Sequence, residues 1–373
     1  MSEDHPAAVD AFDLSIDAAM SIRELKLGAA KRMAYDALAT AQACLGDNST
    51  VAAFAAALIA QLAYEEGDYH HCESSLQQVL NAPGERALIE SLVRAYPLAA
   101  RIALHRGDSP AAVRRLNEGV ALAESRGSER LLATCLQELT NLYIDALDLN
   151  RARYHLRRLE RLNSSTAYVS HGRSVPVEID SSVANARLLL AKGPSRDAEG
   201  LLRRLHREAV ARKDFYLAAT LELRLVEALQ INGEVAESAS ILISGLHVGM
   251  SAGLFQMWID GGPHVHGMLR FLYTKGEHSR NELQPYLRTI VRRLALLGPA
   301  PPNSRTHISK VLLSSRESDI LQLMGRGLTN KHIARDLSIA PETVKSHAKS
   351  IFEKLQARSR TEAVARVSGW SSI

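Results

Sequence analysis

Small and large hydrophobic positions recur along the first two thirds of the chain in a fixed frame. The stretches "EEGDYHHCESSLQQVL" at 65–80 and "HRGDSPAAVRRLNEGV" at 105–120 share this frame, and their glycines lie 40 residues apart. In five copies, a turn residue is followed five positions later by a small residue and nine positions later by leucine. The turn residues are Gly67, Gly107, Leu147, Gly193 and Gly233; the small residues are Cys72, Ala112, Ala152, Ala198 and Ser238; the leucines are Leu76, Leu116, Leu156, Leu202 and Leu242. The copies are spaced by 40, 40, 46 and 40 residues, so one of them carries an insertion, which we place at 165–178.

This frame predicts the second helix of a helical hairpin. A small and a large residue four positions apart lie on one helix face, and an acidic residue after the turn can cap the helix. The candidate caps are Asp68, Asp108, Asp148 and Glu234. Apolar positions in the preceding runs predict the first helices, for instance Ile102, Leu136, Leu139 and Tyr143. Five such hairpins would stack into a right-handed superhelix similar to tetratricopeptide repeats, which are usually about 34 residues long. Helices before residue 60 and after residue 250 would close its ends.

The charge of the chain is unevenly distributed. Residues 312–373 contain ten Lys and Arg against six Asp and Glu, whereas the first 311 residues hold 35 of each kind. The whole net charge of +4 therefore lies in the last sixth of the chain, which predicts a polyanion partner for that terminal module alone. The basic runs at 151–162 and 201–213 could touch nucleic acid. Because the body is neutral, we interpret them instead as solvated helix faces with local acidic partners.

Composition argues against several other classes of protein. Cys44, Cys72 and Cys135 are far apart and in no C-x-x-C spacing, so we expect buried small hydrophobic residues rather than disulfides or a zinc site. The N-terminus does not resemble a signal peptide and no run of about 18 apolar residues offers a membrane span, so we expect a cytoplasmic protein. The histidines at 70–71 and 264–266 lack metal-ligand spacing. No nucleophile with its base is evident, so we expect no enzyme, no cofactor and no metal.

Past the repeats, the sequence predicts a linker and then a first terminal helix. The stretch "GPAPPNSRTH" at 298–307 is rich in proline, and we place the linker at 298–312. Ser314 with Glu317 fits the capping box, as a hydroxyl residue followed three positions later by glutamate. Gly327 can end the helix in the left-handed conformation. Its apolar face comprises Ile320, Leu321 and Met324.

Two more helices are predicted around a tight turn. Thr329 is placed to cap a short helix. That helix would bury Ile333, Ala334 and Leu337. Residues 338–340 make the turn, and Pro341 suits the first position of the next helix because its missing N–H would be unpaired there. A second capping box, Ser359 with Glu362, predicts a fourth helix.

The third of these helices has distinct faces when its residues are placed at intervals of ~100°. The core face comprises Val344, Ala348, Ile351, Phe352 and Leu355; the opposite face comprises Glu342, Lys345, Ser346, Lys349 and Glu353; a flank comprises Thr343, His347, Ser350 and Lys354. A helix that is held by one face and presents lysines on the other is suited to insertion into a DNA major groove. For any single lysine, a solvated amphipathic helix is the better explanation. The caps, turn and linker taken together favour DNA binding.

Residues 313–364 resemble the LuxR-type helix-turn-helix domain. The resemblance is carried by Arg316-Glu317, Gly327, Asn330, Ile333-Ala334, Thr343-Val344-Lys345, His347, Lys354-Leu355 and Ser359-Arg360. It implies that Lys345, Ser346 and Lys349 occupy the base-reading positions, and that the fourth helix from Arg360 supports dimerisation on DNA. The expected DNA-binding residues are Asn330, Lys331, Thr343, Lys345, Ser346, His347, Lys349 and Lys354.

Two positions depart from the pattern of that family. Ala340 stands where the family usually has a serine cap, and His332 where it has glutamate. A lost cap costs about 1 kcal/mol, so we expect the recognition helix to fray more. Neither change removes a group that faces DNA.

The body also carries a resemblance. The repeats, together with "GLFQMWIDGGPHVHGMLRFLY" at 253–273, are similar to the C-terminal half of the large ATP-dependent LuxR-type activators of the MalT type. Those proteins carry an N-terminal ATPase, whereas nothing here fits G-x-x-x-x-G-K-[ST], so ATP control is not expected. The chain is either a short regulator or the C-terminal part of a longer one. The expected organisation is all-α, with helical repeats over 1–297, a linker over 298–312 and a DNA-binding domain over 313–373.

Together these features predict a transcription regulator, and we expect an activator. The repeats would sense a small-molecule or protein effector, and the terminal domain would bind double-stranded DNA as a homodimer and act on RNA polymerase. A phosphorylated receiver or an acyl-homoserine-lactone domain is disfavoured because the body shows only helical patterns. The alternative is a repeat scaffold whose terminal domain is a docking module. The salt dependence of DNA binding separates the two hypotheses.

Overall fold

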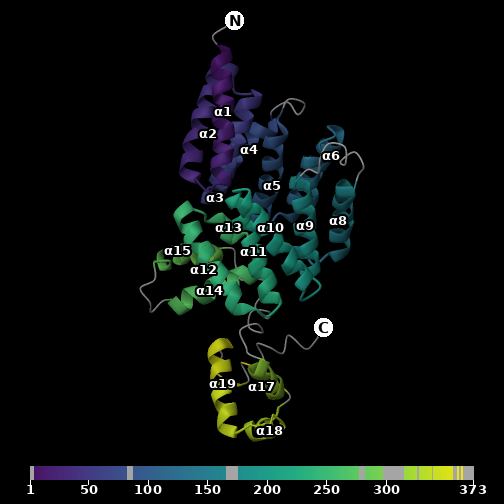
Figure 1. Cartoon of the computed structure of the whole chain (residues 1–373), viewed down its shortest axis with the longest axis vertical. Helices are drawn as coiled ribbons and strands as arrows, with labels where there is room; N and C mark the ends of the chain where they lie inside the picture. Colours follow the sequence, from purple (N-terminus) through teal and green to yellow (C-terminus); the bar gives the residue numbers. More distant parts are fainter. Residues whose placement is uncertain are drawn as a thin grey trace. The chain divides into compact units, whose positions relative to one another are not determined.

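The computed structural model describes residues 4–81, 87–164, 175–276, 282–296, 315–325, 327–337, 339–355, 359–360 and 363. Within these ranges the regular elements are all helices, which confirms the predicted fold class (Figure 1). The chain divides into two compact units. The first unit comprises Met1–Ala228 and Ile241–Asp260, and the second comprises Leu229–Ser240 and Gly261–Ile373.

The repeat helices follow one another in the predicted order. The first helices of the five hairpins are α3 (Thr50–Glu66), α5 (Ile89–His105), α7 (Glu129–Asp145), α9 (Val175–Leu190) and α11 (Phe215–Ile231). The second helices are α4 (Tyr69–Asn81), α6 (Ser109–Ser125), α8 (Leu149–Ser164), α10 (Arg196–Ala211) and α12 (Val235–Ala252). An additional hairpin, α1 (Asp4–Arg23) with α2 (Leu27–Leu45), precedes them, and the short α13 (Gln256–Ile259) follows. Figure 1 shows α1 and α2 lying side by side, and they pack against each other.

All five predicted turn residues have a positive φ. The values are 78° for Gly67, 78° for Gly107, 60° for Leu147, 135° for Gly193 and 87° for Gly233. Leucine adopts this region at a cost of about 1 kcal/mol, and the side chain of Leu147 is 71% exposed. The 40-residue spacing therefore predicts the positive φ even at Leu147, where a leucine side chain does not favour that conformation.

The two repeated core positions are buried in every copy. The small residues Cys72, Ala112, Ala152, Ala198 and Ser238 are all 0% exposed. The leucines are at most 4% exposed, and burying a leucine side chain contributes about 2 kcal/mol. This burial agrees with the predicted helix face on which one small and one large residue of each copy lie. Ala112, Leu116, Ala152 and Leu156 all belong to one hydrophobic core cluster of the first unit.

Three of the four predicted acidic caps accept a backbone hydrogen bond at a helix start. Asp68 accepts from the His71 N–H at 3.0 Å, and Asp148 accepts from the Arg151 N–H at 3.0 Å. Asp108 accepts from the N–H three residues later at 2.8 Å. Such a cap contributes about 1 kcal/mol to helix stability. The capping role of Glu234 stays a prediction.

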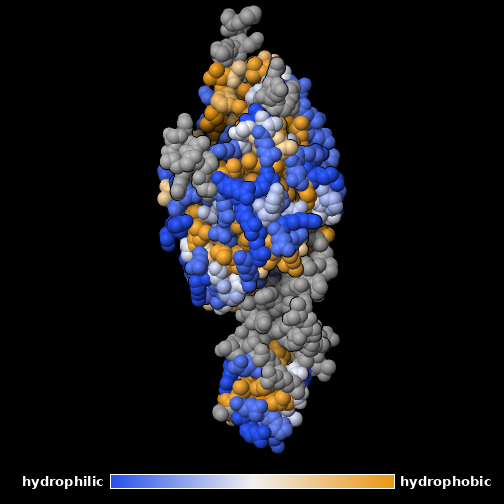
Figure 2. All heavy atoms as spheres, turned by 90° about the vertical axis from the view of Figure 1, so that its right-hand side faces the viewer, coloured by the Kyte–Doolittle hydropathy of each residue, from blue (hydrophilic) through white to orange (hydrophobic). Residues whose placement is uncertain are grey.

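The basic runs on α8 and α10 have the acidic neighbours that the sequence predicts. Arg158 pairs with Glu124 at 2.6 Å, and Arg203 pairs with Glu199 at 3.1 Å. Further ion pairs join Arg151 with Asp148, Arg204 with Glu208, and Arg212 with Glu208. The face drawn in Figure 2 accordingly intersperses hydrophilic and hydrophobic residues over the repeats.

One described helix corrects an expectation about membranes. α12 has the length and apolar composition of a membrane span, with a mean hydropathy of 1.2 over 18 residues. This is weak evidence, because core helices of soluble proteins meet the same criteria. The register of α12 is that of the other second helices, with Ser238 and Leu242 buried. The repeat accounts for the burial of these two positions, whereas Ile243 and Val248 of the same helix are 37% and 48% exposed.

The predicted burial of the cysteines is confirmed at two of the three positions. Cys72 and Cys135 are buried as predicted, whereas Cys44 is half-buried, and all three are free thiols. Burial raises the pKa of Cys72 and of Cys135 to about 12. His71 hydrogen bonds with the Tyr35 hydroxyl at 2.6 Å. Within the described ranges, no group of three or more His, Cys, Asp or Glu is arranged to hold a metal ion.

The second unit contains the terminal helices. They are α14 (Gly262–Gly276), α15 (Gln284–Leu296), α17 (Ser315–Gly325), α18 (Asn330–Asp336) and α19 (Pro341–Leu355). The predicted linker at 298–312, together with Ser314 and Glu362, lies outside the described residues, so the two capping boxes are not tested. Most of the predicted insertion also lies outside them, and its last four residues open α9.

Candidate nucleic-acid interface

Helices α17, α18 and α19 share one small hydrophobic core. Its buried residues are Ile320, Leu321, Met324, Ile333, Ala334, Val344, Ala348, Ile351 and Ala363. These include every core residue predicted for the first helix, and Leu337 and Phe352 pack against the cluster. One face of α19 is thus fixed by its contacts with α17 and α18.

The turn into α18 forms as the sequence predicts. Gly327 has a φ of 82°, in the left-handed region. The Thr329 hydroxyl accepts a hydrogen bond from the His332 N–H at 3.4 Å, so Thr329 is the N-cap. The ring Nδ1 of His332 also lies 3.0 Å from this hydroxyl. His332, one of the two departures from the family pattern, therefore engages the same cap.

Helix α19 begins at Pro341, as predicted from the missing N–H. The Ala340 carbonyl accepts from the N–H groups of Thr343 at 3.0 Å and Val344 at 3.3 Å. The first turn of α19 is therefore formed with a residue at 340 that has no side-chain acceptor.

The predicted DNA-binding residues lie mainly on exposed faces. Thr343, Lys345, Ser346 and Lys349 on α19 and Lys331 on α18 are exposed, whereas Asn330 and His347 are half-buried. The side chain of Lys354 lies outside the described residues. Val344 and Ala348 are buried between these exposed positions, so the two faces of α19 are separated as the helical period predicts.

Lys345 contacts a neighbour on its own helix. Its Nζ lies 2.9 Å from Glu342 Oε1, one turn earlier, and both side chains are largely exposed. An exposed pair of this kind is weak because solvent screens it. Lys345 can therefore exchange this carboxylate for a phosphate or a base edge at little cost.

Three residues of the LuxR-type pattern hold the helices together instead of facing outward. Arg316 on α17 donates to the Leu337 carbonyl at 2.5 Å. Arg360 donates to the carbonyls of Met324 at 3.1 Å and Leu328. The buried carboxylate of Glu317 accepts from the Ser350 hydroxyl at 2.7 Å.

Sequence reasoning matched Arg316, Glu317 and Arg360 to the family without giving them these roles. No local signal in the sequence marks these contacts, because Arg316 and Arg360 donate to backbone carbonyls, which every residue carries. The Ser350–Glu317 bond joins α19 to α17, and the Arg316 bond joins α17 to the end of α18. The arrangement can bind a polyanion through cations and hydroxyls on one rigid helix face.

Comparisons with known families agree with this architecture. Residues 311–367 match the family described as bacterial regulatory proteins, luxR family. Residues 2–275, which are most of the chain, match the family described as the MalT-like TPR region. The first match covers the three-helix domain, and the second covers the repeats.

Individual relatives are similar to this chain over part of its length. The nitrate/nitrite response regulator protein NarL of Escherichia coli K12 is 49% identical over 55 residues, which are 15% of this chain and 26% of the relative. A probable csgAB operon transcriptional regulatory protein of Salmonella typhimurium is 32% identical over 112 residues, 29% of this chain and 51% of the relative. The monoamine regulon transcriptional regulator of Klebsiella aerogenes is 42% identical over 55 residues, 15% of this chain and 24% of the relative.

The chain thus spans between a quarter and a half of the length of these relatives. The match over residues 2–275 covers the helical repeats, and the match over 311–367 covers the domain built on α17, α18 and α19. The chain therefore belongs to the family that is built on a MalT-like TPR region, and it carries a C-terminal domain of the luxR family of bacterial regulatory proteins.

Proposed function

We propose that this protein is a cytoplasmic transcription regulator, an activator, that binds double-stranded DNA through α19. The observation that carries the proposal is the arrangement of α19. Val344, Ala348 and Ile351 fix one face to the rest of the domain, and the opposite face exposes Lys345 and Lys349. Lysine ammonium groups can donate to guanine O6 and N7 in the major groove.

The remaining predicted residues divide by role. Thr343 and Ser346 can donate hydroxyl hydrogens to phosphates or bases, and Lys331 and Lys354 supply phosphate contacts. Asn330 and His347 are half-buried and stand at the edge of this surface. We propose that two copies bind together, so that half-sites lie about 34 Å apart or a multiple of it.

The repeats give the proposed regulator its sensing part. Stacked helical hairpins form extended surfaces for small molecules or proteins. The three relatives named above, which their names describe as regulators, are similar to this chain over 15–29% of its length. We propose that an effector bound to the repeats controls how the terminal domain acts on RNA polymerase.

Selection of random duplex DNA tests the proposal. The full chain and its Lys345→Ala/Lys349→Ala variant are each taken through the same selection, and binding is then measured as the salt concentration rises. We expect the wild type to enrich a two-fold-related motif that the variant loses. The logarithm of its affinity should fall with the logarithm of salt by about 0.9 per phosphate contact.

The matched control removes two exposed lysines from the repeats, as Lys26→Ala/Lys192→Ala. It should enrich the wild-type motif. If the wild-type chain enriches no motif and its binding to DNA is insensitive to salt, the DNA-binding proposal is wrong and a docking module is favoured.

A further inference from the structure

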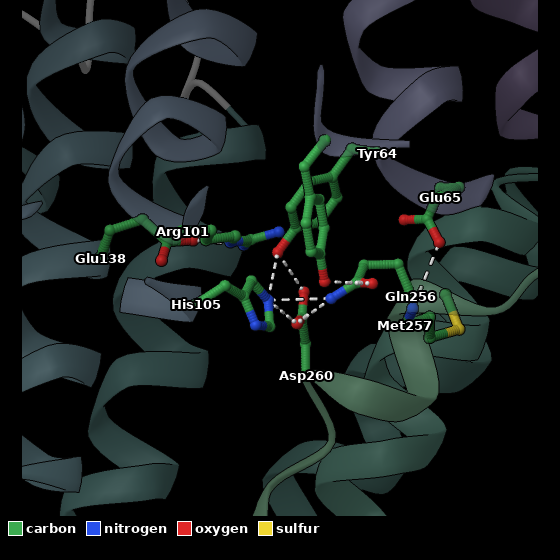
Figure 3. Close-up of polar contacts among 9 residues, drawn as sticks. Tyr64, Glu65, Arg101, His105, Glu138, Gln256, Met257 and Asp260 are labelled. Atoms are coloured by element: carbon green, nitrogen blue, oxygen red, sulfur yellow. Dashed lines mark hydrogen bonds and ion pairs between the residues drawn. The ribbon is translucent and has the colours of Figure 1, made fainter. Parts of the chain in front are cut away.

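A polar cluster in the first unit joins segments that are far apart in the sequence. The segment Phe255–Asp260, which includes α13, lies against α3, α4 and α5 (Figure 3). Met257, Trp258 and Ile259 of this segment are buried, and polar side chains of the segment also contact α3, α4 and α5. Such a density of buried polar groups is costly unless each is paired, so their pairing requires an explanation.

Gln256 contributes one half of this contact. Its side-chain oxygen accepts from the Tyr69 hydroxyl at 2.8 Å, and its amide nitrogen lies 2.8 Å from His105 Nε2. Gln256 is only 1% exposed. The glutamine amide thus contacts side chains of both α4 and α5. Figure 3 shows Gln256 beside His105 and Asp260.

Asp260 contributes the other half. It accepts from the Tyr64 hydroxyl at 2.8 Å, and its second oxygen lies 3.0 Å from His105 Nε2 and accepts from Gln256 Nε2 at 3.0 Å. Residues four apart lie on one face of a helix. A single helical turn therefore presents a paired amide and carboxylate to Tyr64, Tyr69 and His105.

The walls of this cluster are held in place by their own contacts. The rings of Tyr69 and His105 are stacked with centroids 5.2 Å apart. Arg101 pairs with Glu138 of α7, and this charge raises the pKa of Arg101 well above its ordinary value. The guanidinium also lies close enough to Asp260 and Tyr64 to interact with them electrostatically. Tyr69, His105 and the Arg101 cation are therefore also held by contacts outside the segment.

Glu65 holds the backbone of the same segment. Its main-chain carbonyl accepts from the Phe255 N–H at 3.3 Å, and its carboxylate accepts from the Met257 N–H at 3.3 Å. The Tyr216 hydroxyl of α11 donates to the same carboxylate. Glu65 thus contacts the backbone of the segment, whereas Tyr64, Tyr69 and His105 contact the side chains of Gln256 and Asp260.

We propose that the surface formed by Tyr64, Glu65, Tyr69 and His105 is a binding site for a short helical segment that presents a glutamine and, one turn later, a carboxylate. In this structure the site is occupied in cis by Phe255–Asp260. The chemistry is that of peptide recognition: one backbone N–H of the segment donates to a carboxylate and another to a main-chain carbonyl, and two side chains of the segment hydrogen bond with polar side chains of the site. The segment of the same chain occupies the site, and a separate peptide that carries the same two side chains would compete with it for the same surface.

The experiment removes the two recognised side chains and supplies them in trans. The full-length Gln256→Ala/Asp260→Ala variant is mixed with a fluorescent synthetic peptide of residues 251–263, and binding is followed by fluorescence anisotropy. A control peptide carries the same two alanines. We expect the wild-type peptide to bind the variant at least about tenfold more tightly than it binds the wild-type chain, and the control peptide to bind neither. Equal binding to both chains, or none to the variant, overturns the proposal.

Amide hydrogen exchange tests the proposal independently, in a variant that changes only one hydroxyl group. Tyr69→Phe removes only the hydroxyl that Gln256 accepts from, so the chain should fold. We expect amide exchange in 255–260 to speed up about tenfold while α3 and α5 keep their protection. The matched control is Tyr143→Phe, because the Tyr143 ring stacks on His155 at 5.4 Å in the same manner, outside this site. Unchanged exchange in 255–260, or the same change in the control, overturns the proposal.

Discussion

The hydroxyl of Ser350 on α19 donates to the carboxylate of Glu317 on α17 at 2.7 Å, and Glu317 is only 4% exposed. This bond joins the helix proposed to read DNA to the first helix of its domain. Hydrogen bonds to buried charged groups are among the stronger ones in proteins, because their loss leaves the charge less well solvated. The orientation of α19 therefore depends on a contact that does not itself face DNA.

Ser350→Ala should destabilise the terminal domain by about 1–3 kcal/mol, because it removes one donor from the buried carboxylate. Its effect on DNA binding should be the same for all sequences. Hydrogen exchange of the α19 amides in the full chain measures the destabilisation. Ser346→Ala on the same helix is the control, since Ser346 is exposed and its removal should leave these amides protected.

The two exposed lysines of α19 should differ from other cations of the domain. Lys345→Ala or Lys349→Ala should each cost about 1–3 kcal/mol at the cognate site and relax the base preference. Lys354→Ala should weaken binding to all sequences alike, because a phosphate contact carries no sequence information. Dissociation constants on the selected site and on a scrambled duplex of equal length measure both quantities. Equal losses on both duplexes for all three variants would show that the roles are wrongly assigned.

Gly119 on α6 allows a close approach of three helices. A Cβ atom at this position would lie 2.6 Å from Cys135 Sγ and 2.9 Å from Tyr96 Cγ. Gly119→Ala should therefore destabilise the repeats by about 1–3 kcal/mol, although alanine favours helices. Thermal unfolding followed by circular dichroism measures the effect.

Gly200 on α10 is the matched control for that change. A Cβ at Gly200 would meet nothing within 4 Å. Gly200→Ala should stabilise the protein by about 0.5–1 kcal/mol, because alanine loses less backbone entropy in a helix. Shifts of the same sign for both variants would contradict the packing argument at Gly119.

The repeats and the terminal domain could be predicted because their signals are local or periodic. A turn residue, a small residue and a leucine recur in one frame, and each copy confirms the others. Even Leu147, whose side chain does not favour a positive φ, is placed correctly by its position in the period. The cap at Thr329 and the start of α19 at Pro341 depend on residues only a few positions apart.

The polar cluster around Gln256 could not be predicted in the same way. Tyr69 and Gln256 are 187 residues apart, and Tyr64 and Asp260 are 196 apart. No sequence period links these residues, and each residue type is common on helices.

The contacts of Arg316 and Arg360 could not be predicted for another reason. Their acceptors are backbone carbonyls, which every residue carries, so the sequence does not mark them.

Glu65 makes the stability of the repeats depend on pH. Burial raises the pKa of this carboxyl to about 7 in the folded protein, from an ordinary value of 4.5. Between these two values the folded state holds a proton that the unfolded state has lost. Stability therefore falls as the pH rises through this window and levels off above it, by about 3 kcal/mol in total. Burial raises the pKa of Asp180 to about 7 as well, which adds a slope of the same sign.

Glu65→Gln should flatten this dependence without removing it, because Asp180 still contributes. The measurement is the midpoint of thermal unfolding of the full chain at about pH 5 and about pH 8. The difference between the two midpoints should be smaller in the variant than in the wild type. Glu66→Gln changes the adjacent residue, which is exposed and pairs with Lys31, and should keep the wild-type difference. If Glu65→Gln and the wild type lose the same stability between the two pH values, Glu65 does not titrate in this window and its carboxylate is stabilised in the charged form by the Tyr216 hydroxyl and the Met257 N–H.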